Sequence, residues 1–228
     1  MKLVIISDAH FPVPYSMLFR QIIEREHPDH LVFLGDNVQA DRGEDLMRLH
    51  KQFIAEIKRL HPLSRTVYLI GDNDYAQQSE IKRYISRNGF MNKDPARFHA
   101  GNMDFFHGNI EERVSFGSGR FNRILEQFGY RALKASGRIG KRILPKVVSG
   151  TMRFIHHVPR HNYLFLGHIH LLNRSGNDIF CGTLKAKKII FEPYESIGYV
   201  TVKHSDFVIA SPDSIKIHDL SAHRVRPA

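Results

Sequence analysis

The 228-residue sequence has no tryptophan, a single cysteine and no long apolar run. A lone Cys181 excludes a disulfide framework and a zinc site built from cysteines, as is typical of a reducing compartment. No stretch approaches the roughly 18 apolar residues of a membrane-spanning helix. The apolar run 3–6 also begins too early to leave the charged region of a signal peptide. We therefore expect a cytoplasmic protein, with a peripheral position at the membrane as the alternative.

Acidic residues are scarce in one part of the chain. The whole sequence has 33 Lys and Arg against 23 Asp and Glu, a net charge of +10. Residues 111–160 contain 11 of these basic residues and only three acidic ones. Such a segment suits an acidic partner, which could be a phosphate-bearing substrate, an anionic lipid or a nucleic acid. The alternative is an amphipathic helix pair whose basic face is simply solvated.

The length and the 42% hydrophobic content predict one well-packed domain over residues 1–220. The basic segment at about 111–160 would be a helical insertion in that domain. Its apolar residues follow helical spacing, with basic residues interleaved. Residues 221–228 are expected to form a disordered tail.

Apolar runs alternate with helical patterns in the first part of the chain. The strands predicted from unbroken β-branched and aromatic runs are 3–6, 31–34, 67–70, 103–106 and 163–166. The helices predicted between the first runs are 17–26, 44–60 and 79–87. This alternation predicts an α/β fold with a largely parallel sheet. After residue 178 the pattern changes to strands without helices, at 179–181, 198–202, 207–210 and 215–217, which predicts antiparallel hairpins.

Polar residues able to bind a metal follow each of the first five strands. The five segments are Ser7-Asp8-Ala9-His10, Gly35-Asp36-Asn37, Gly71-Asp72-Asn73-Asp74, His107-Gly108-Asn109 and Gly167-His168-Ile169-His170. Ligands of open α/β sheets bind beyond the carboxyl ends of the strands, so the five loops should converge. Glycines at 35, 71, 108 and 167 would permit tight turns or close backbone approach. Oxygen and imidazole groups without cysteine suit two divalent ions such as manganese, iron, zinc, nickel or magnesium.

The ordered series of five motifs resembles that of the calcineurin-like metallophosphoesterases, over residues 3 to 185. This resemblance implies a four-layer α-β-β-α sandwich with a dinuclear metal centre, manganese being the preferred ion. By position, the resemblance assigns Asp8, His10 and His170 to the first metal. It makes Asp36 the bridge between both ions, and it assigns Asp72, His107 and His168 to the second metal.

The third motif departs from the family's usual Gly-Asn-His sequence. Asp72 stands where the family has the ligand Asn, which keeps an oxygen ligand, and Asn73 stands where the family has a His. That His protonates the leaving group in many members, and Asn cannot act as a general acid. A leaving group that departs without protonation is therefore expected. We assign catalytic roles to Asn73 and His168, and substrate binding to Asn37, Asn73 and Asn109.

The resemblance implies hydrolysis of a phosphodiester or phosphoanhydride by a metal-bound hydroxide. The basic insertion resembles that of the UDP-diacylglucosamine hydrolases, whose third motif also lacks the His. A nucleotide- or lipid-linked phosphate substrate and peripheral contact with an anionic membrane are therefore expected. A nuclease acting on DNA is one alternative, although the absence of Trp and of a second DNA-binding module weighs against it. A non-catalytic metal-binding scaffold is the other, and the nearly complete ligand set weighs against that.

Overall fold

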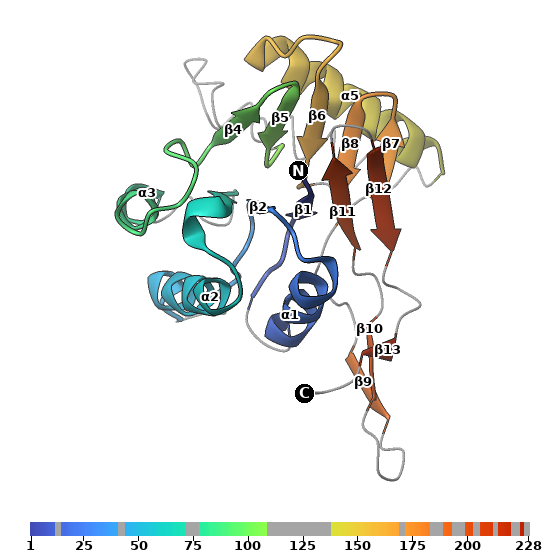
Figure 1. The fold of residues 1–228 in the computed structure, drawn as a ribbon. Helices are drawn as coiled ribbons and strands as arrows, with labels where there is room; N and C mark the ends of the chain where they lie inside the picture. Colours follow the sequence, from blue (N-terminus) through green and yellow to red (C-terminus); the bar gives the residue numbers. More distant parts are fainter. Residues whose placement is uncertain are drawn as a thin grey trace.

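The computed structural model describes residues 1–11, 15–40, 44–71, 78–108, 138–168, 172–182, 189–192, 199–202, 206–211, 214–219 and 224–225. Two five-stranded sheets dominate this part of the chain, and four α-helices lie beside them (Figure 1). The helices are α1 (Tyr15–Glu26), α2 (Leu46–Leu60), α3 (Gln78–Arg87) and α5 (Arg138–His156), and a short 3₁₀ turn, η1, spans Leu63–Arg65. None of the described helices is both long enough and apolar enough to cross a membrane.

The first sheet has the strand order β12-β11-β1-β2-β3. Its strands are β1 (Leu3–Ile6), β2 (His30–Leu34), β3 (Thr66–Leu69), β11 (Asp206–Ser211) and β12 (Ser214–Asp219). β1, β2 and β3 are parallel, so their carboxyl ends meet at one edge. β11 pairs antiparallel to both β1 and β12. The predicted parallel core and the late hairpin are both present in this sheet.

The second sheet has the order β4-β5-β6-β8-β7. Its strands are β4 (Arg97–Ala100), β5 (Met103–Phe106), β6 (Tyr163–Leu166), β7 (Leu172–Ser175) and β8 (Asp178–Cys181). β8 pairs antiparallel to β7 but parallel to β6, which differs from the purely antiparallel arrangement expected after residue 178. β5, β6 and β8 are thus parallel to one another, as β1, β2 and β3 are in the first sheet.

A small third sheet has the order β13-β10-β9, with β9 at Ile189–Glu192, β10 at Tyr199–Val202 and β13 at Arg224–Val225. β10 pairs antiparallel to both neighbours. β13 falls within the segment expected to be a disordered tail, while the other residues of that segment lie outside the described ones.

The layers are visible in how alternate residues of one strand are buried. In β1, Val4 and Ile6 join the apolar cluster that contains α2, whereas Leu3 and Ile5 join a second cluster between the two sheets. A third cluster packs α5 on the outer face of the second sheet, through Leu144, Val148 and Met152 on the helix. Three apolar layers between four layers of structure make an α-β-β-α sandwich, as the sequence predicts. Figure 1 shows α1 and α2 on one side of the molecule and α5 on the other.

Local contacts fix the ends of two helices. The side chain of Asp45 accepts hydrogen bonds from the backbone N–H groups of Met47 and Arg48, which caps α2 at its N-terminus. Near the end of α5, Arg153 donates to the Asp178 carboxylate at 2.7 Å and to the carbonyl oxygen of Asn162 at 2.9 Å. α5 is thereby tied to β8 and to the entry of β6. Within the predicted insertion at 111–160, residues 111–137 lie outside the described residues.

Candidate metal centre

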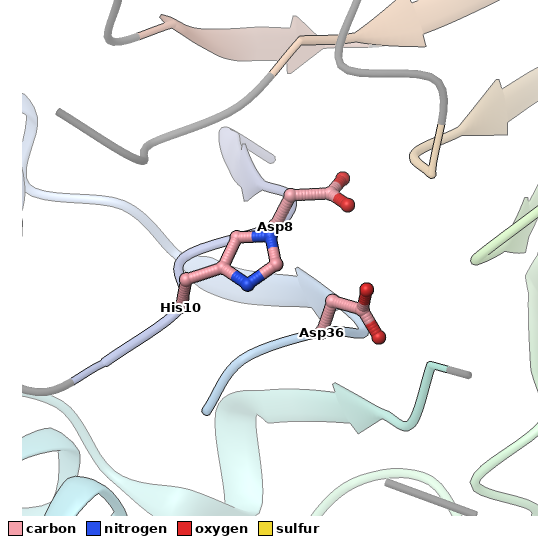
Figure 2. Close-up of side chains that lie close together, drawn as sticks. All are labelled: Asp8, His10 and Asp36. Carbon is pink, nitrogen blue, oxygen red and sulfur yellow. The ribbon is translucent and has the colours of Figure 1, made fainter. Parts of the chain in front are cut away.

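Three of the predicted metal ligands lie together beyond the ends of β1 and β2. Each of Asp8, His10 and Asp36 offers one ligand atom, and these atoms all lie within 4.8 Å of one another. Figure 2 shows the three side chains gathered at the loops that follow the two strands. Asp8 is fully buried, and His10 and Asp36 are 6% and 4% exposed. Carboxylate oxygen and imidazole nitrogen at this spacing form a suitable donor set for a divalent transition metal.

Backbone hydrogen bonds between the two loops hold the three residues in place. The N–H of Asp8 donates to the carbonyl oxygen of Gly35 at 3.1 Å, and the N–H of His10 donates to that of Asp36 at 2.9 Å. Asp8, His10 and Asp36 all have φ near +50°, a left-handed conformation that non-glycine residues seldom adopt. Such backbone strain is kept only where the surroundings enforce it, and it concentrates at functional sites.

The ends of the second sheet meet the same cluster. His107, which follows β5, is fully buried, and its Nε2 lies 3.5 Å from Oδ1 of Asp36. His168, which follows β6, donates its backbone N–H to Oδ2 of Asp8 at 3.0 Å. The rings of His107 and His168 are 5.2 Å apart, edge to face. The predicted convergence is therefore observed for β1, β2, β5 and β6.

The tautomer of His107 supports a cation between the two sheets. Nδ1 of His107 lies 2.8 Å from the carbonyl oxygen of Leu34, which can only accept, so Nδ1 carries the proton. In a neutral ring Nε2 is then an acceptor, and it faces a carboxylate oxygen, which is another acceptor. Either a shared metal ion or a second proton on the ring reconciles the two atoms, and the Leu34 carbonyl is the kind of outer partner that orients metal-binding imidazoles.

Two glycines leave room for this arrangement. A Cβ on Gly71, at the end of β3, would lie 2.7 Å from Nε2 of His107 and would overlap the Asp36 carboxylate. A Cβ on Gly167 would overlap the Ser7 hydroxyl and come within 2.9 Å of Oδ2 of Asp8. Gly71 also brings the end of β3 to the cluster, so all five predicted strand ends converge. The expected close backbone approach is confirmed at both glycines.

The structure adds contributors that the sequence patterns did not single out. The Ser7 hydroxyl donates to Oδ2 of Asp8 and, with the N–H of His168, orients that carboxylate. Cys181 is fully buried in the layer between the sheets; burial raises the pKa of its thiol far above the ordinary value, and the charge of Asp8 raises it further. Burial and the charge of Asp8 thus both favour the protonated thiol of Cys181 in the metal-free protein.

Several predicted site residues lie outside the described part of the chain, namely Asp72, Asn73, Asn109 and His170. Asn37 is described and fully buried, and its amide nitrogen donates to the carbonyl oxygen of Leu69 at 2.7 Å. That bond ties the loop after β2 to β3. The substrate-binding role of Asn37 and the catalytic role of His168 stay predictions.

Comparisons with known proteins bear on the fold. No family model matches the chain, and no curated protein sequence matches it. Among solved structures, the chain is similar to YfcE, a phosphoesterase from E. coli, with 12% identity, a TM-score of 0.53 and 99% of each chain covered. It also aligns with an archaeal phosphodiesterase, at 14% identity and a TM-score of 0.48 over 96% of this chain and 99% of that one. A metallophosphoesterase from Sphaerobacter thermophilus aligns at 14% identity and a TM-score of 0.45, over 96% and 88% of the two chains.

Because the sequence identity to YfcE is 12%, this likeness shows the fold alone. The layered architecture and the convergent strand ends agree with it. The chain therefore shares its α-β-β-α fold with YfcE.

Proposed function

We propose that this protein is a metal-dependent phosphoesterase that hydrolyses a phosphodiester or a phosphoanhydride. One observation carries the proposal: Asp8, His10 and Asp36 bring their ligand atoms within 4.8 Å at the carboxyl ends of parallel strands. His107 faces Asp36 from the second sheet. Buried carboxylates and imidazoles in this arrangement have little structural use, because a hydrophobic contact would stabilise the sandwich better.

The donor set fits two divalent ions, manganese being our preferred choice. Asp8 and His10 would hold the first ion together with His170, and Asp36 would bridge both. His107 would hold the second, with Asp72 and His168. Two such ions lower the pKa of a bound water and neutralise charge that develops on a phosphoryl group. Ser7 and the backbone of His168 keep the Asp8 carboxylate oriented for this task.

The residues around the metals set the class of substrate. Asn73 would donate a hydrogen bond to the phosphoryl oxygens, while His168 would contribute as a metal ligand, and Asn37 and Asn109 are the further substrate-binding candidates. Asn73 has no proton to give to the departing oxygen at neutral pH. The bond to a poor leaving group would therefore break slowly. Aryl esters and anhydrides, whose leaving groups are weakly basic, are the substrates that this site suits.

The test is a manganese-supplemented activity screen of the full chain. It would compare bis(p-nitrophenyl) phosphate, a phosphomonoester, a nucleotide anhydride and single-stranded DNA, with the metal content measured in parallel. We expect turnover of the diester and the anhydride, loss of turnover with a chelator, and recovery with Mn²⁺. Turnover restricted to DNA, with a steep fall as salt rises, would favour a nuclease. Metal content near zero after Mn²⁺ loading would favour the non-catalytic scaffold.

A matched pair of histidine variants makes the screen specific. His10→Ala removes a buried ligand and should abolish Mn²⁺-dependent turnover. His99→Ala removes an exposed histidine that also pairs with a carboxylate, since its Nδ1 lies 2.8 Å from Oδ1 of Asp104. His99→Ala should keep the wild-type rate. Equal losses in both variants would contradict the assignment of the centre.

A further inference from the structure

The helix α5 presents an apolar stripe to solvent. Ile143, Val147 and Phe154 have exposed fractions of 42%, 49% and 82%. At 3.6 residues per turn the three positions fall within an arc of about 40° and span roughly 16 Å along the helix axis. Solvent exposure of a single apolar residue is ordinary, but an aligned row of three on one helix is a feature of binding surfaces.

The stripe is distinct from the face with which α5 packs on the domain. Leu144, Val148 and Met152 point into the outer core cluster and are at most 9% exposed. Their mean direction lies about 120° around the helix from the stripe. The three stripe residues are absent from the buried cluster that packs α5 on the second sheet, and Figure 1 shows α5 at the outside of the molecule.

The charged residues of the segment that contains the stripe have one sign. Residues 138–160 contain six Lys and Arg and no Asp or Glu. Arg153 is committed to Asp178, whereas Lys146, between Ile143 and Val147, and Arg160 are exposed. Apolar side chains in a row with cations beside them match the boundary of an anionic bilayer, where acyl chains meet phosphate groups. A nucleic-acid duplex would satisfy the cations but offers little apolar surface to a row that contains the aliphatic residues Ile143 and Val147.

We propose that the outer face of α5, comprising Ile143, Val147, Phe154 and Lys146, docks this protein on the surface of an anionic phospholipid bilayer. α5 would lie in the plane of the interface with the stripe inserted among the lipids. No described helix could span the bilayer, so the attachment is peripheral. Docking would hold the metal centre next to a membrane and does not depend on which substrate that centre takes.

The experiment is vesicle sedimentation of the full chain. One set of vesicles is phosphatidylcholine alone, and the other has equal parts of phosphatidylcholine and phosphatidylglycerol. We expect binding to the anionic vesicles that weakens as salt rises, and little binding to the neutral ones. Val147→Ser and Phe154→Ser should each lower the partition coefficient about tenfold, from the apolar surface that each removes. Lys146→Glu should lower it by about an order of magnitude at low salt.

Met91→Ser is the matched control, because Met91 is 40% exposed but lies outside α5. It should bind vesicles like the wild type. Absence of binding to anionic vesicles at low salt, or wild-type binding by Phe154→Ser, would overturn the proposal. Two further measurements exclude other uses of the stripe. A lower melting temperature in Phe154→Ser would mean that the stripe packs on this chain. If Phe154→Ser dissociates a dimer, the stripe belongs to a contact with a second copy. If the wild type binds DNA but not vesicles, and Phe154→Ser loses that DNA binding, the stripe belongs to a nucleic-acid site.

Discussion

Gly71→Ala is the substitution that tests the metal centre most directly, because it adds one methyl group and removes no ligand. The added Cβ would lie 2.5 Å from the backbone nitrogen of Asp36 and 2.7 Å from Nε2 of His107, and closer still to Oδ1 of Asp36. Ordinary contacts begin at 3.4 Å. The carboxylate and the imidazole would therefore have to move by roughly 1 Å, whereas metal–ligand distances tolerate about 0.2 Å.

The expected effect is specific to metal binding and turnover. Misplacement by about 1 Å should lower kcat/KM on the order of 10²-fold, and the apparent Mn²⁺ affinity should fall about 10- to 100-fold. Overpacking should cost about 1–3 kcal/mol of unfolding free energy, which leaves the protein folded at the assay temperature. Calorimetric titration with Mn²⁺, diester hydrolysis and thermal unfolding would measure the three effects on the same preparation.

Gly150→Ala is the matched control. Gly150 lies within α5, and no atom lies within 4 Å of the Cβ that alanine would add there. Alanine should stabilise the helix by up to about 1 kcal/mol and leave the metal affinity unchanged. If Gly71→Ala binds Mn²⁺ and turns over substrate like the wild type, then Asp36 and His107 are not metal ligands in the arrangement described above.

Three further predictions follow from single residues. Asp36→Asn should abolish turnover with the fold intact. It should also raise the melting temperature of the metal-free protein, because it removes one of two buried carboxylates of the described cluster. Retained activity with metal bound would contradict the bridging role. Asn73→His should accelerate the hydrolysis of substrates with poor leaving groups by on the order of 10²- to 10⁴-fold, and that of substrates with good leaving groups little. A shallow plot of log rate against leaving-group pKa, unchanged by the substitution, would show that an acid is already present. Burial lowers the pKa of His61 below its ordinary 6.5. The folded state should therefore lose stability as the pH falls from 6.5 to the folded-state pKa. Urea unfolding across this range should show a weaker pH dependence in His61→Gln, and an unchanged dependence would show that His61 is not its source.

The sequence predicts that Asp8, His10, Asp36, His107 and His168 lie close together because the signal is local. Each strand that precedes a predicted ligand is a short and largely buried run, and the predicted ligand follows within four residues, as in the step from Leu3–Ile6 to Asp8 and His10. Parallel pairing then brings the ends together without further information. The glycines give a second local signal, since Gly71 and Gly167 occupy positions where a side chain would collide with a ligand or its partner.

Edge strands were missed for the opposite reason. β4 alternates between exposed and half-buried residues, and β7 has no buried residue at all. Neither has the apolar run that marks a central strand, and their positions depend on pairing with β5 and β8. The parallel pairing of β8 with β6 was equally hidden, because the direction of a strand is set by its connection and not by its own residues.

The contacts that tune the centre are also beyond local patterns. The carbonyl of Leu34 selects the tautomer of His107, 73 positions away in the chain, and the N–H of His168 orients a carboxylate 160 positions away. Both are backbone groups, which every residue type has. A sequence pattern can predict the metal ligand, but only the folded structure identifies the backbone group that orients it.

The same contacts explain how a costly site persists in a small domain. Asp8, His10, Asp36 and His168 all have positive φ, and each such non-glycine residue costs on the order of 1–3 kcal/mol. Two carboxylates are buried at the same place, which adds repulsion in a medium of low polarity. The two loops pair their backbones and also pack Phe11 and Val38 into the first core cluster, and the three core clusters supply the stability that tolerates the strained site. A cation that bound only the folded state would offset part of this cost, by an amount that grows with the logarithm of its concentration over its dissociation constant. In the proposed function the metal centre and the fold would therefore be coupled, and ligand geometry that is unfavourable for stability would be retained because it preorganises the cation site.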